Sequence, residues 1–354
     1  MDNTGFLSQI TLNTVGPVRN CAIALSKNER RHLILTGRNG SGKTAVLQAV
    51  RDALQPPASR RPPLTLTFEH WVAWQTAQQD NACIMAYYPA SFRLAIEAPK
   101  GTDTLELPCP CAMNDRPGQW FLQHLVNVHA EKTLARNAGR HERVKECDSW
   151  LTMLDHALQG LFHDSTLTVR FHHQASGFTL VSQQYGSRDF SQLSDGQSRV
   201  LSIFCDLLMR MKCLKSTEDN YDFPGIVLID GLENSLHTEV QKRILPFLVD
   251  FFPNVQFFVS THSPFIINSL DTAVVFDLDR HSRLNDVLKY PYEAIIERCD
   301  LSKYSEQIKQ LLGEYEKLLN KQLKTEHEGF RLLELGDYLA WVLTKFRQGN
   351  SNNP

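Results

Sequence analysis

The sequence lacks the features that mark membrane, secreted and strongly charged proteins. No apolar run reaches the roughly 18 to 20 residues that a membrane-spanning helix needs, and no basic stretch followed by an apolar one opens the chain. The 37 Lys and Arg residues nearly balance the 39 Asp and Glu residues. We therefore expect a cytoplasmic protein without a membrane partner, in which only a local basic patch would contact nucleic acid.

Cysteine is present without a disulfide pattern. Eight cysteines are scattered along the chain, and with no export signal we expect reduced, buried thiols. Cys109 and Cys111 are spaced too closely for a zinc knuckle, and no second Cys/His pair at ligand spacing accompanies them. Structural thiols are therefore expected here rather than a metal site.

Nothing in the composition suggests disorder. The chain is 42% hydrophobic and 21% charged, which is ordinary for a globular protein. Its 354 residues predict roughly two domains, or one large two-lobed domain. No internal repeat is present. A chain of this size buries about three-quarters of its extended surface and needs no metal or disulfide for stability.

Short apolar strands alternate with helical patterns, which is typical of a parallel sheet covered on both faces. The polar stretch 131–145 is expected to form an exposed turn within a largely helical region, and the proline-rich stretch 56–63 a loop. The expected strands are 6–12, 21–25, 33–35, 64–68, 83–88, 167–171, 178–181, 226–229, 256–259 and 274–276. The expected helices are 45–54, 119–161, 197–213, 240–251 and 305–346.

Residues 37–44 read Gly-Arg-Asn-Gly-Ser-Gly-Lys-Thr and match the phosphate-binding loop G-x-x-x-x-G-K-[ST]. The loop lies between a buried strand and a helix, where its backbone N–H groups and the helix dipole favour a phosphate anion. The Lys43 ammonium would reach the β- and γ-phosphates, and the Thr44 hydroxyl would bind Mg²⁺. A chance Gly-rich turn would not be expected in this context.

Three further segments fit the same chemistry. Asp230 ends the apolar strand 226–229, where a phosphate-loop enzyme places its second Mg²⁺-orienting group. Residues 193–197, Leu-Ser-Asp-Gly-Gln, open a predicted helix, and a serine hydroxyl at a helix N-terminus suits a phosphate. Read alone, the same residues would form an ordinary Ser N-cap. His262 follows the strand 256–259, a position at which a lone histidine is more often structural.

In this order, the motifs resemble those of ABC-type ATPases. Residues 193–197 resemble the signature motif, with Asp195 at the usual glycine position, and Ser-Thr-His-Ser-Pro at 260–264 resembles the switch-histidine motif. The signature motif with Asp195 is most similar to that of the soluble SMC, RecF and OLD branch of these ATPases. The phrases Leu-Ser-Asp-Gly, Glu-Asn-Ser-Leu-His and Thr-His-Ser-Pro-Phe resemble AAA-type ATP-binding proteins of bacterial defence- and virulence-associated operons. The resemblance extends over residues 6–285.

The resemblance implies an α/β fold, a P-loop NTPase ABC-type head with two lobes, a mostly parallel core sheet and a helical insert. The N-terminal ATPase lobe with the P-loop is expected at 1–116 and the helical insert at 117–165. The signature helix, the Asp230 strand and the His262 strand would complete the core at 166–285. A C-terminal helical segment is expected at 286–354.

The resemblance also implies ATP and Mg²⁺ as cofactors, and a head-to-tail homodimer or higher homo-oligomer with ATP at the interface. Lys43, Asp230, Glu233 and His262 are the expected catalytic residues, and Thr44 and Asp230 the expected metal ligands. The expected nucleotide-binding residues are Gly37, Asn39, Gly40, Ser41, Gly42, Lys43, Thr44, Ser194, Gly196 and Gln197.

One position departs from the family. The Mg²⁺ aspartate is normally followed by a glutamate that orients or deprotonates the attacking water, whereas Gly231 follows Asp230 here. Glu233 is the next carboxylate, but a residue further along projects differently. Loss of a general base costs about 10²- to 10⁴-fold in rate. We therefore expect ATP binding with slow hydrolysis, unless Glu233, His237 or a partner ATPase supplies the missing group.

Several weaker signals have bland explanations. Arg136 and His141 fit the R-x4-H spacing of HEPN-type ribonucleases, but a solvated helix or loop is the simpler interpretation. The Asp277-Leu-Asp279 segment resembles a TOPRIM D-x-D, yet too few residues follow it for such a domain. The arginine pairs at 30–31 and 60–61 could contact phosphates of nucleic acid, but exposed surface charge is the simpler interpretation. The helices of 305–346 are expected to pack against the ATPase lobe rather than against a partner.

The role that we expect is that of a sensor or regulator of a separately encoded effector in antiphage-type defence, because the chain carries no effector domain of its own. A RecF-like DNA-binding clamp of repair or recombination is the alternative. Binding of duplex DNA with an affinity that falls steeply as the salt concentration rises would reveal such a clamp. A transporter motor is third, since Asp195 and the Thr-His-Ser-Pro motif do not fit it. The insert 117–165 is far shorter than an SMC coiled-coil arm.

Overall fold

A computed structural model of the chain was analysed. It describes residues 5–54, 63–100, 107, 109–172, 177–184, 186–214, 223–284, 306–319, 321, 328, 331–332 and 335–336. The chain divides into two compact units, Met1–Leu284 and Asn285–Pro354. Nearly all the motifs of interest belong to the first unit. None of its described helices combines the length and apolarity needed to cross a bilayer.

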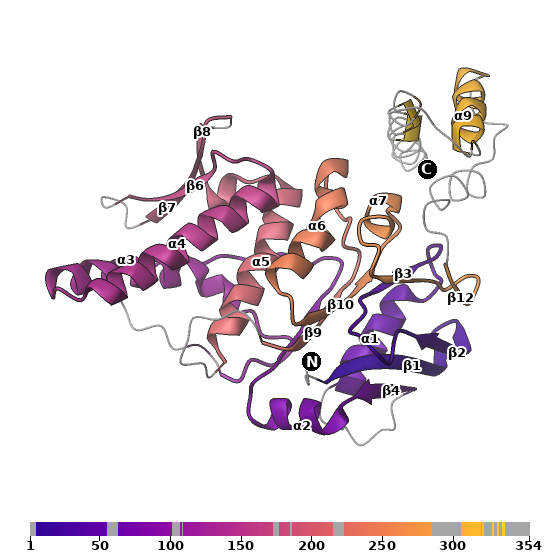
Figure 1. The fold of residues 1–354 in the computed structure, drawn as a ribbon, viewed down its shortest axis with the longest axis horizontal. Coiled ribbons are helices and arrows are strands. Elements are labelled where there is room, and N and C mark those ends of the chain that lie inside the picture. The colour runs from indigo at the N-terminus through magenta and orange to yellow at the C-terminus, as the bar shows by residue number, and fades with distance from the viewer. Residues whose placement is uncertain are drawn as a thin grey trace, which may run out of the picture. The chain divides into compact units, whose positions relative to one another are not determined.

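A six-stranded, mostly parallel sheet forms the centre of the first unit (Figure 1). Five strands run parallel, and the short β12 adds an antiparallel edge. All four internal strands are buried along their whole length, as expected when helices cover both faces. The strand order is β12 (Ser282–Arg283), β11 (Val274–Asp277), β3 (Leu33–Thr36), β10 (Val255–Ser260), β9 (Gly225–Ile229) and β5 (Ile84–Tyr88).

A second, antiparallel sheet completes the N-terminal part. Its order is β2 (Val18–Ala24), β1 (Phe6–Val15) and β4 (Leu64–Glu69). Helix α1 (Lys43–Leu54) lies between the two sheets and contacts β1 and β4 on one side and β9 and β10 on the other. Apolar side chains of α1 and both sheets form one hydrophobic cluster, and this packing fixes the start of α1 at the loop that follows β3.

Further helices of the first unit pack on the other side of the central sheet. Helix α5 (Asp195–Lys212) contacts β5 and the 3₁₀ turn η1 (Pro117–Trp120), while α6 (Thr238–Phe251) contacts β10 and α7 (Pro264–Ile267). Helices α3 (Phe121–Asn137) and α4 (His141–Phe162) form a hairpin that extends from this side (Figure 1). A third sheet follows them, made of β6 (Thr168–His172), β7 (Gly177–Ser182) and β8 (Gly186–Asp189).

The α/β P-loop fold with a mostly parallel core sheet and a helical insert is therefore confirmed. The expected exposed turn over 131–145 is wrong in extent, because α3 and α4 take up all of it except residues 138–140. Ion pairs from Arg143 to Glu131 and to Glu146 stabilise these polar helical turns. The connection between the two helices is short because Gly139, with φ +66°, adopts the left-handed conformation that ends a helix.

Other differences are additions. Helix α2 (Trp71–Gln79), β8 and α7 were not expected from the pattern. Helix α9 (Glu306–Leu319) lies in the expected helical region 305–346, most of whose remainder falls outside the described residues. The expected loop 56–63 also falls there, apart from residue 63.

One buried ion pair ties α5 to the segment that leads into the helical hairpin. The side chains of Asp206 and Arg210 are 0% and 1% exposed, and Arg210 Nε lies 2.9 Å from Asp206 Oδ2. The Tyr88 hydroxyl and the Gly118 amide also donate to the Asp206 carboxylate, at 2.8 and 3.1 Å. The Arg210 guanidinium donates to four backbone carbonyls, those of Met85, Ala112, Met113 and Asp115. Both charges are thus fully hydrogen-bonded.

Removing one member of this pair should destabilise the protein strongly. Asp206→Ala leaves a buried guanidinium without its counter-charge, which costs about 3–5 kcal/mol. Lys145→Ala is the matched control, because its ion pair with Glu142 is 72% and 82% exposed and should contribute less than about 1 kcal/mol. Urea unfolding followed by circular dichroism measures both. Equal midpoints for the two variants would contradict a structural role for the buried pair.

Candidate functional site

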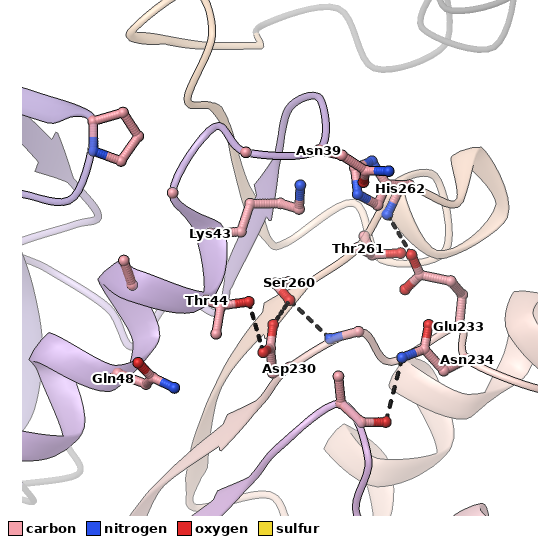
Figure 2. Close-up of a pocket in the computed structure, with 16 residues that line it drawn as sticks. Asn39, Lys43, Thr44, Gln48, Asp230, Glu233, Asn234, Ser260, Thr261 and His262 are labelled. Carbon is pink, nitrogen blue, oxygen red and sulfur yellow. Dashed lines mark hydrogen bonds between the residues drawn. The ribbon is translucent and has the colours of Figure 1, made fainter.

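A cavity of about 560 Å³ opens where β3, β9 and β10 end. Because these strands are parallel and adjacent, their carboxyl ends bring distant sequence segments to one edge of the sheet. Figure 2 shows the residues that surround it. The lining residues are Pro17, Asn39, Gly40, Gly42, Lys43, Thr44, Ala45, Gln48, Ala90, Asp230, Gly231, Glu233, Asn234, Ser260, Thr261 and His262.

The loop 37–42 forms one wall and leads into α1. Gly37, Gly40 and Gly42 all have positive φ, at +136°, +86° and +99°, a conformation that glycine adopts without strain. A Cβ at Gly42 would also lie 3.0 Å from the Pro17 ring. The ammonium of Lys43 donates to the carbonyls of Gly37 and Arg38, at 2.8 and 2.9 Å. Lys43 is thereby held across the mouth of the loop.

Asp230 and Thr44 form the centre of the site. The Thr44 hydroxyl donates to Asp230 Oδ2 at 2.8 Å, and the Ser260 hydroxyl donates to Asp230 Oδ1 at 2.5 Å. The same Ser260 oxygen accepts the amide of Gly231 at 2.8 Å. A carboxylate beside a threonine hydroxyl is the oxygen donor set that Mg²⁺ prefers, so these two residues fit the expected metal.

The residues after Asp230 explain the departure at position 231. Gly231 has φ +60°, and a Cβ there would lie 2.6 Å from Nδ2 of Asn234. Glu233 instead reaches the cavity, where its Oε1 accepts the backbone N–H of His262 at 2.7 Å. Its other oxygen, Oε2, is buried without a hydrogen-bond partner in the structure, an unusual state for a polar atom. His237 caps α6 and does not line the cavity.

The signature residues lie elsewhere. Ser194 is the N-cap of α5: its Oγ accepts the Gln197 amide, and Gln197 Oε1 accepts the Ser194 amide, both at 3.3 Å. This capping box leaves Ser194 exposed. Gly196 packs so closely on Ser235 that a Cβ would lie 2.2 Å from its carbonyl oxygen. None of the three predicted signature residues lines the cavity of its own chain, nor do Gly37 and Ser41.

Sequence reasoning missed Arg199. This residue lies on α5 and is 2% exposed, yet its guanidinium donates to the carbonyls of Asp230 and Gly231, at 2.9 and 3.2 Å. It also donates to the carbonyl of Ala90. Burial and the nearby Arg93 lower the pKa of Arg199. A basic residue two positions after the signature segment was the available signal.

Asp279 was missed as a neighbour of the phosphate loop. Asp277 ends β11 and its carboxylate accepts the Asp279 amide at 2.8 Å, which is the strand-end turn expected instead of a TOPRIM motif. The Asp279 carboxylate in turn accepts the Arg38 amide at 2.5 Å. This contact ties the turn after β11 to the first half of the loop.

The weaker candidates do not form sites. Arg136 and His141 lie exposed at the tip of the α3–α4 hairpin. Arg30 and Arg31 donate to carbonyls of Asn254 and Thr272, while residues 60–61 fall outside the described part. In the described ranges, no group of three or more His, Cys, Asp or Glu side chains is arranged to hold a metal ion.

Comparison with known families finds a match in the middle of the chain. Residues 122–268 match the family described as "AAA domain, putative AbiEii toxin, Type IV TA system". This segment contains the signature residues, Asp230, Glu233 and His262, while the phosphate loop precedes it.

Curated relatives match shorter stretches. The "Retron Ec83 probable ATPase" of Escherichia coli is 36% identical over 26% of this chain and 17% of that protein. The "Retron Vc95 probable ATPase" of Vibrio cholerae serotype O1 biovar El Tor is 30% identical over 36% of this chain and 27% of that protein. The "Septu protein PtuA" of Bacillus mycoides (strain KBAB4) is 29% identical over 45% of this chain and 20% of that protein. The chain thus spans less than a third of the length of these relatives.

Solved structures show a partial likeness. The "SMC head domain from Thermotoga maritima" has a TM-score of 0.39 and 14% identity, covering 77% of this chain and 94% of that one. The CbiO1 structure from Clostridium perfringens, titled as part of the ABC transporter complex CbiONQ, has a TM-score of 0.41 and 12% identity, covering 87% and 99%. The resemblance to ATPases of defence-associated systems, inferred from the motifs, is confirmed by the matched family and the curated relatives.

The geometry makes Lys43 the residue to test first for nucleotide binding. Lys43→Ala should weaken binding of ATP about 10- to 100-fold, because a hydrogen bond from a charged group contributes roughly 1.5–3 kcal/mol. Fluorescence anisotropy with a labelled ATP measures the affinity. Lys145→Ala, at the exposed hairpin, should bind as the unaltered chain does. Unchanged affinity in Lys43→Ala would place the nucleotide outside this cavity.

Proposed function

We propose that the chain binds ATP with Mg²⁺ in the cavity between the phosphate loop, β9 and β10. The observation that carries the proposal is the convergence of Lys43, the Thr44–Asp230 pair and His262 on one cavity. In this proposal, Lys43 holds the terminal phosphates and Thr44 and Asp230 bind the metal, whose charge would stabilise the phosphate oxygens. His262 would contact the γ-phosphate from the opposite wall.

We further propose that ATP joins two copies head to tail. Ser194, Gly196 and Gln197 lie at the N-terminus of α5, outside the cavity of their own chain. The helix dipole at this end of α5 favours an anion, and the Arg93 guanidinium, 3.5 Å from the exposed Asp195 carboxylate of the first turn, offsets the charge of that carboxylate. A phosphate bound in the cavity of a second copy is the anion that this end of α5, the signature surface, would meet. The nucleotide would then add contacts that exist only in the closed pair.

Slow hydrolysis is proposed because position 231 lacks the usual glutamate. Glu233 lines the cavity together with Asp230, and the amide of His262 holds one of the Glu233 oxygens while Oε2 has no hydrogen-bond partner. This supports Glu233 as the group that would orient or deprotonate water in any residual reaction. His237 is a poorer candidate, since it lies outside the cavity.

The biological role that we propose is regulation of a separately encoded effector in an antiphage-type defence system. Its support is the similarity to retron and Septu proteins over part of their length. A RecF-like DNA clamp is the second candidate. The two differ in DNA binding, because a clamp would bind duplex DNA with ATP and lose affinity steeply as salt rises.

The dimer should form with ATP and depend on Ser194. Light scattering during gel filtration is expected to show a monomer without nucleotide or with ADP, and a dimer with ATP and Mg²⁺. Ser194→Glu should abolish the dimer, because its carboxylate would repel the phosphate held by the other copy. ATP affinity of the single chain should be retained.

Ser194→Thr is the matched control, since threonine keeps the capping hydroxyl. It should dimerise with ATP as the unaltered chain does. If Ser194→Glu dimerises equally well, the signature surface does not meet ATP. A dimer that forms without nucleotide would show that ATP is not what joins the two copies.

Glu233→Gln tests the residual reaction. Glutamine keeps an oxygen that accepts the His262 amide but cannot take a proton, so phosphate release should fall about 10²- to 10⁴-fold while ATP affinity stays unchanged. Phosphate release is measured against the unaltered chain and His237→Ala, which should retain its rate. An unchanged rate in Glu233→Gln would assign the base to another group or to a partner.

A further inference from the structure

Two cysteines far apart in sequence meet beside the C-terminal end of α5. Cys111 lies in the segment before η1, and Cys213 is the C-cap of α5. A hydrogen bond joins the two thiols, with 3.0 Å between the Sγ atoms. Cys213 is buried, Cys111 is partly exposed and Cys109 is exposed. A small oxidant can therefore reach the pair from the side of Cys111.

The backbone on both sides of this pair is already held in place. Arg210, one turn before Cys213, donates to the carbonyls of Ala112 and Met113, which directly follow Cys111. The same guanidinium is bonded to buried Asp206. A disulfide has an S–S bond of about 2.05 Å, so the two sulfurs need to approach by only about 1 Å. The existing contacts keep them in reach.

The two thiols differ in their readiness to ionise. The hydrogen bond shared with Cys213 lowers the pKa of Cys111, the nearby Arg210 charge acts in the same direction, and burial opposes both. The hydrogen bond to Cys111, burial and a further hydrogen bond to Cys109 raise the pKa of Cys213. A thiolate is the nucleophile in reactions with oxidants, so the partly exposed Cys111 would react first and Cys213 would be the thiol that resolves the product.

We propose that Cys111 and Cys213 are an oxidation site at which a hydroperoxide forms an intramolecular disulfide. With hydrogen peroxide as the hydroperoxide, the Cys111 thiolate attacks one peroxide oxygen, and the O–O bond breaks to give the sulfenic acid and hydroxide. The hydroxide takes up the proton that the Cys111 thiol released and becomes the first water. The Cys213 sulfur then attacks the Cys111 sulfur, and the hydroxyl group leaves as water together with the Cys213 proton. Two thiols lose two electrons in total, and one peroxide becomes two waters.

The bridge would lock the end of α5 to the segment before the helical hairpin. It would close a loop of about 100 residues, and constraining a loop of this length in the unfolded chain stabilises the fold. Helix α5 has 18 residues, so its signature end lies about 27 Å away at 1.5 Å per residue. Oxidation should therefore raise Tm by several degrees without removing ATP binding.

The experiment oxidises the purified full chain with hydrogen peroxide, alkylates the remaining thiols, and maps disulfides by mass spectrometry of a non-reducing digest. We expect one linked peptide pair, Cys111 with Cys213, and loss of two of the eight thiols. Reduction with dithiothreitol should restore both thiols and reverse the rise in Tm. The result does not depend on whether the chain hydrolyses ATP.

Matched variants separate this site from general cysteine oxidation. Cys111→Ser and Cys213→Ser should lose the linked pair, whereas Cys109→Ser and Cys83→Ser should keep it. Burial raises the pKa of Cys83 to about 12, so that thiol should remain reduced. A linkage that uses Cys109, or no linkage in the unaltered chain, would overturn the proposal even if a serine variant failed to fold.

Discussion

The site depends on one buried carboxylate and the groups that bind it. Asp230 is 5% exposed, and each of its oxygens accepts a hydroxyl, one from Thr44 on α1 and one from Ser260 at the end of β10. Its amide donates to the Tyr88 carbonyl at the end of β5, and its carbonyl accepts the Arg199 guanidinium from α5. A buried carboxylate is costly unless it is satisfied in this way. Asp230 therefore joins four elements at the edge of the sheet.

Arg199 extends this arrangement towards the signature surface. It lies on α5, five residues after Ser194, and binds the Asp230 and Gly231 carbonyls behind the cavity. Helix α5 thus connects the backbone of Asp230 with the exposed N-cap Ser194. Any shift of the Asp230–Gly231 backbone would be transmitted to α5 through buried hydrogen bonds, which resist partial rearrangement. This gives a physical route between a nucleotide in the cavity and the face that would meet a second copy.

The sequence was informative wherever one local pattern implied one chemistry. The strand, glycine and helix order around 37–44 predicted the loop, and the resemblance to ABC-type ATPases implied that Asp230 and His262 would lie at the same site as this loop. Contacts between distant side chains could not be predicted in this way. The bond from the Arg38 amide to the Asp279 carboxylate depends on tertiary packing. So do the bonds that Tyr88 and the Ala112 carbonyl make with the local i,i+4 pair Asp206–Arg210. The length of the turn between α3 and α4 was overestimated, because polar helical turns that are stabilised by ion pairs have the composition of loops.

The backbone conformation and the neighbouring side chains at position 231 both favour glycine over a residue with a side chain. The φ of +60° at Gly231 would cost a residue with a side chain about 1–2 kcal/mol, and Ser260 and Arg199 hold the Gly231 amide and carbonyl from opposite sides. Asn234 occupies the space that a side chain at 231 would need and donates to the Ala90 carbonyl. Because the next turn is bent back onto β10 by the bond from the Leu232 amide to the Ser260 carbonyl, Glu233 reaches the cavity in its place. The amide that orients Glu233 belongs to His262, so a movement of the His262 backbone would also move the carboxylate that we propose as base.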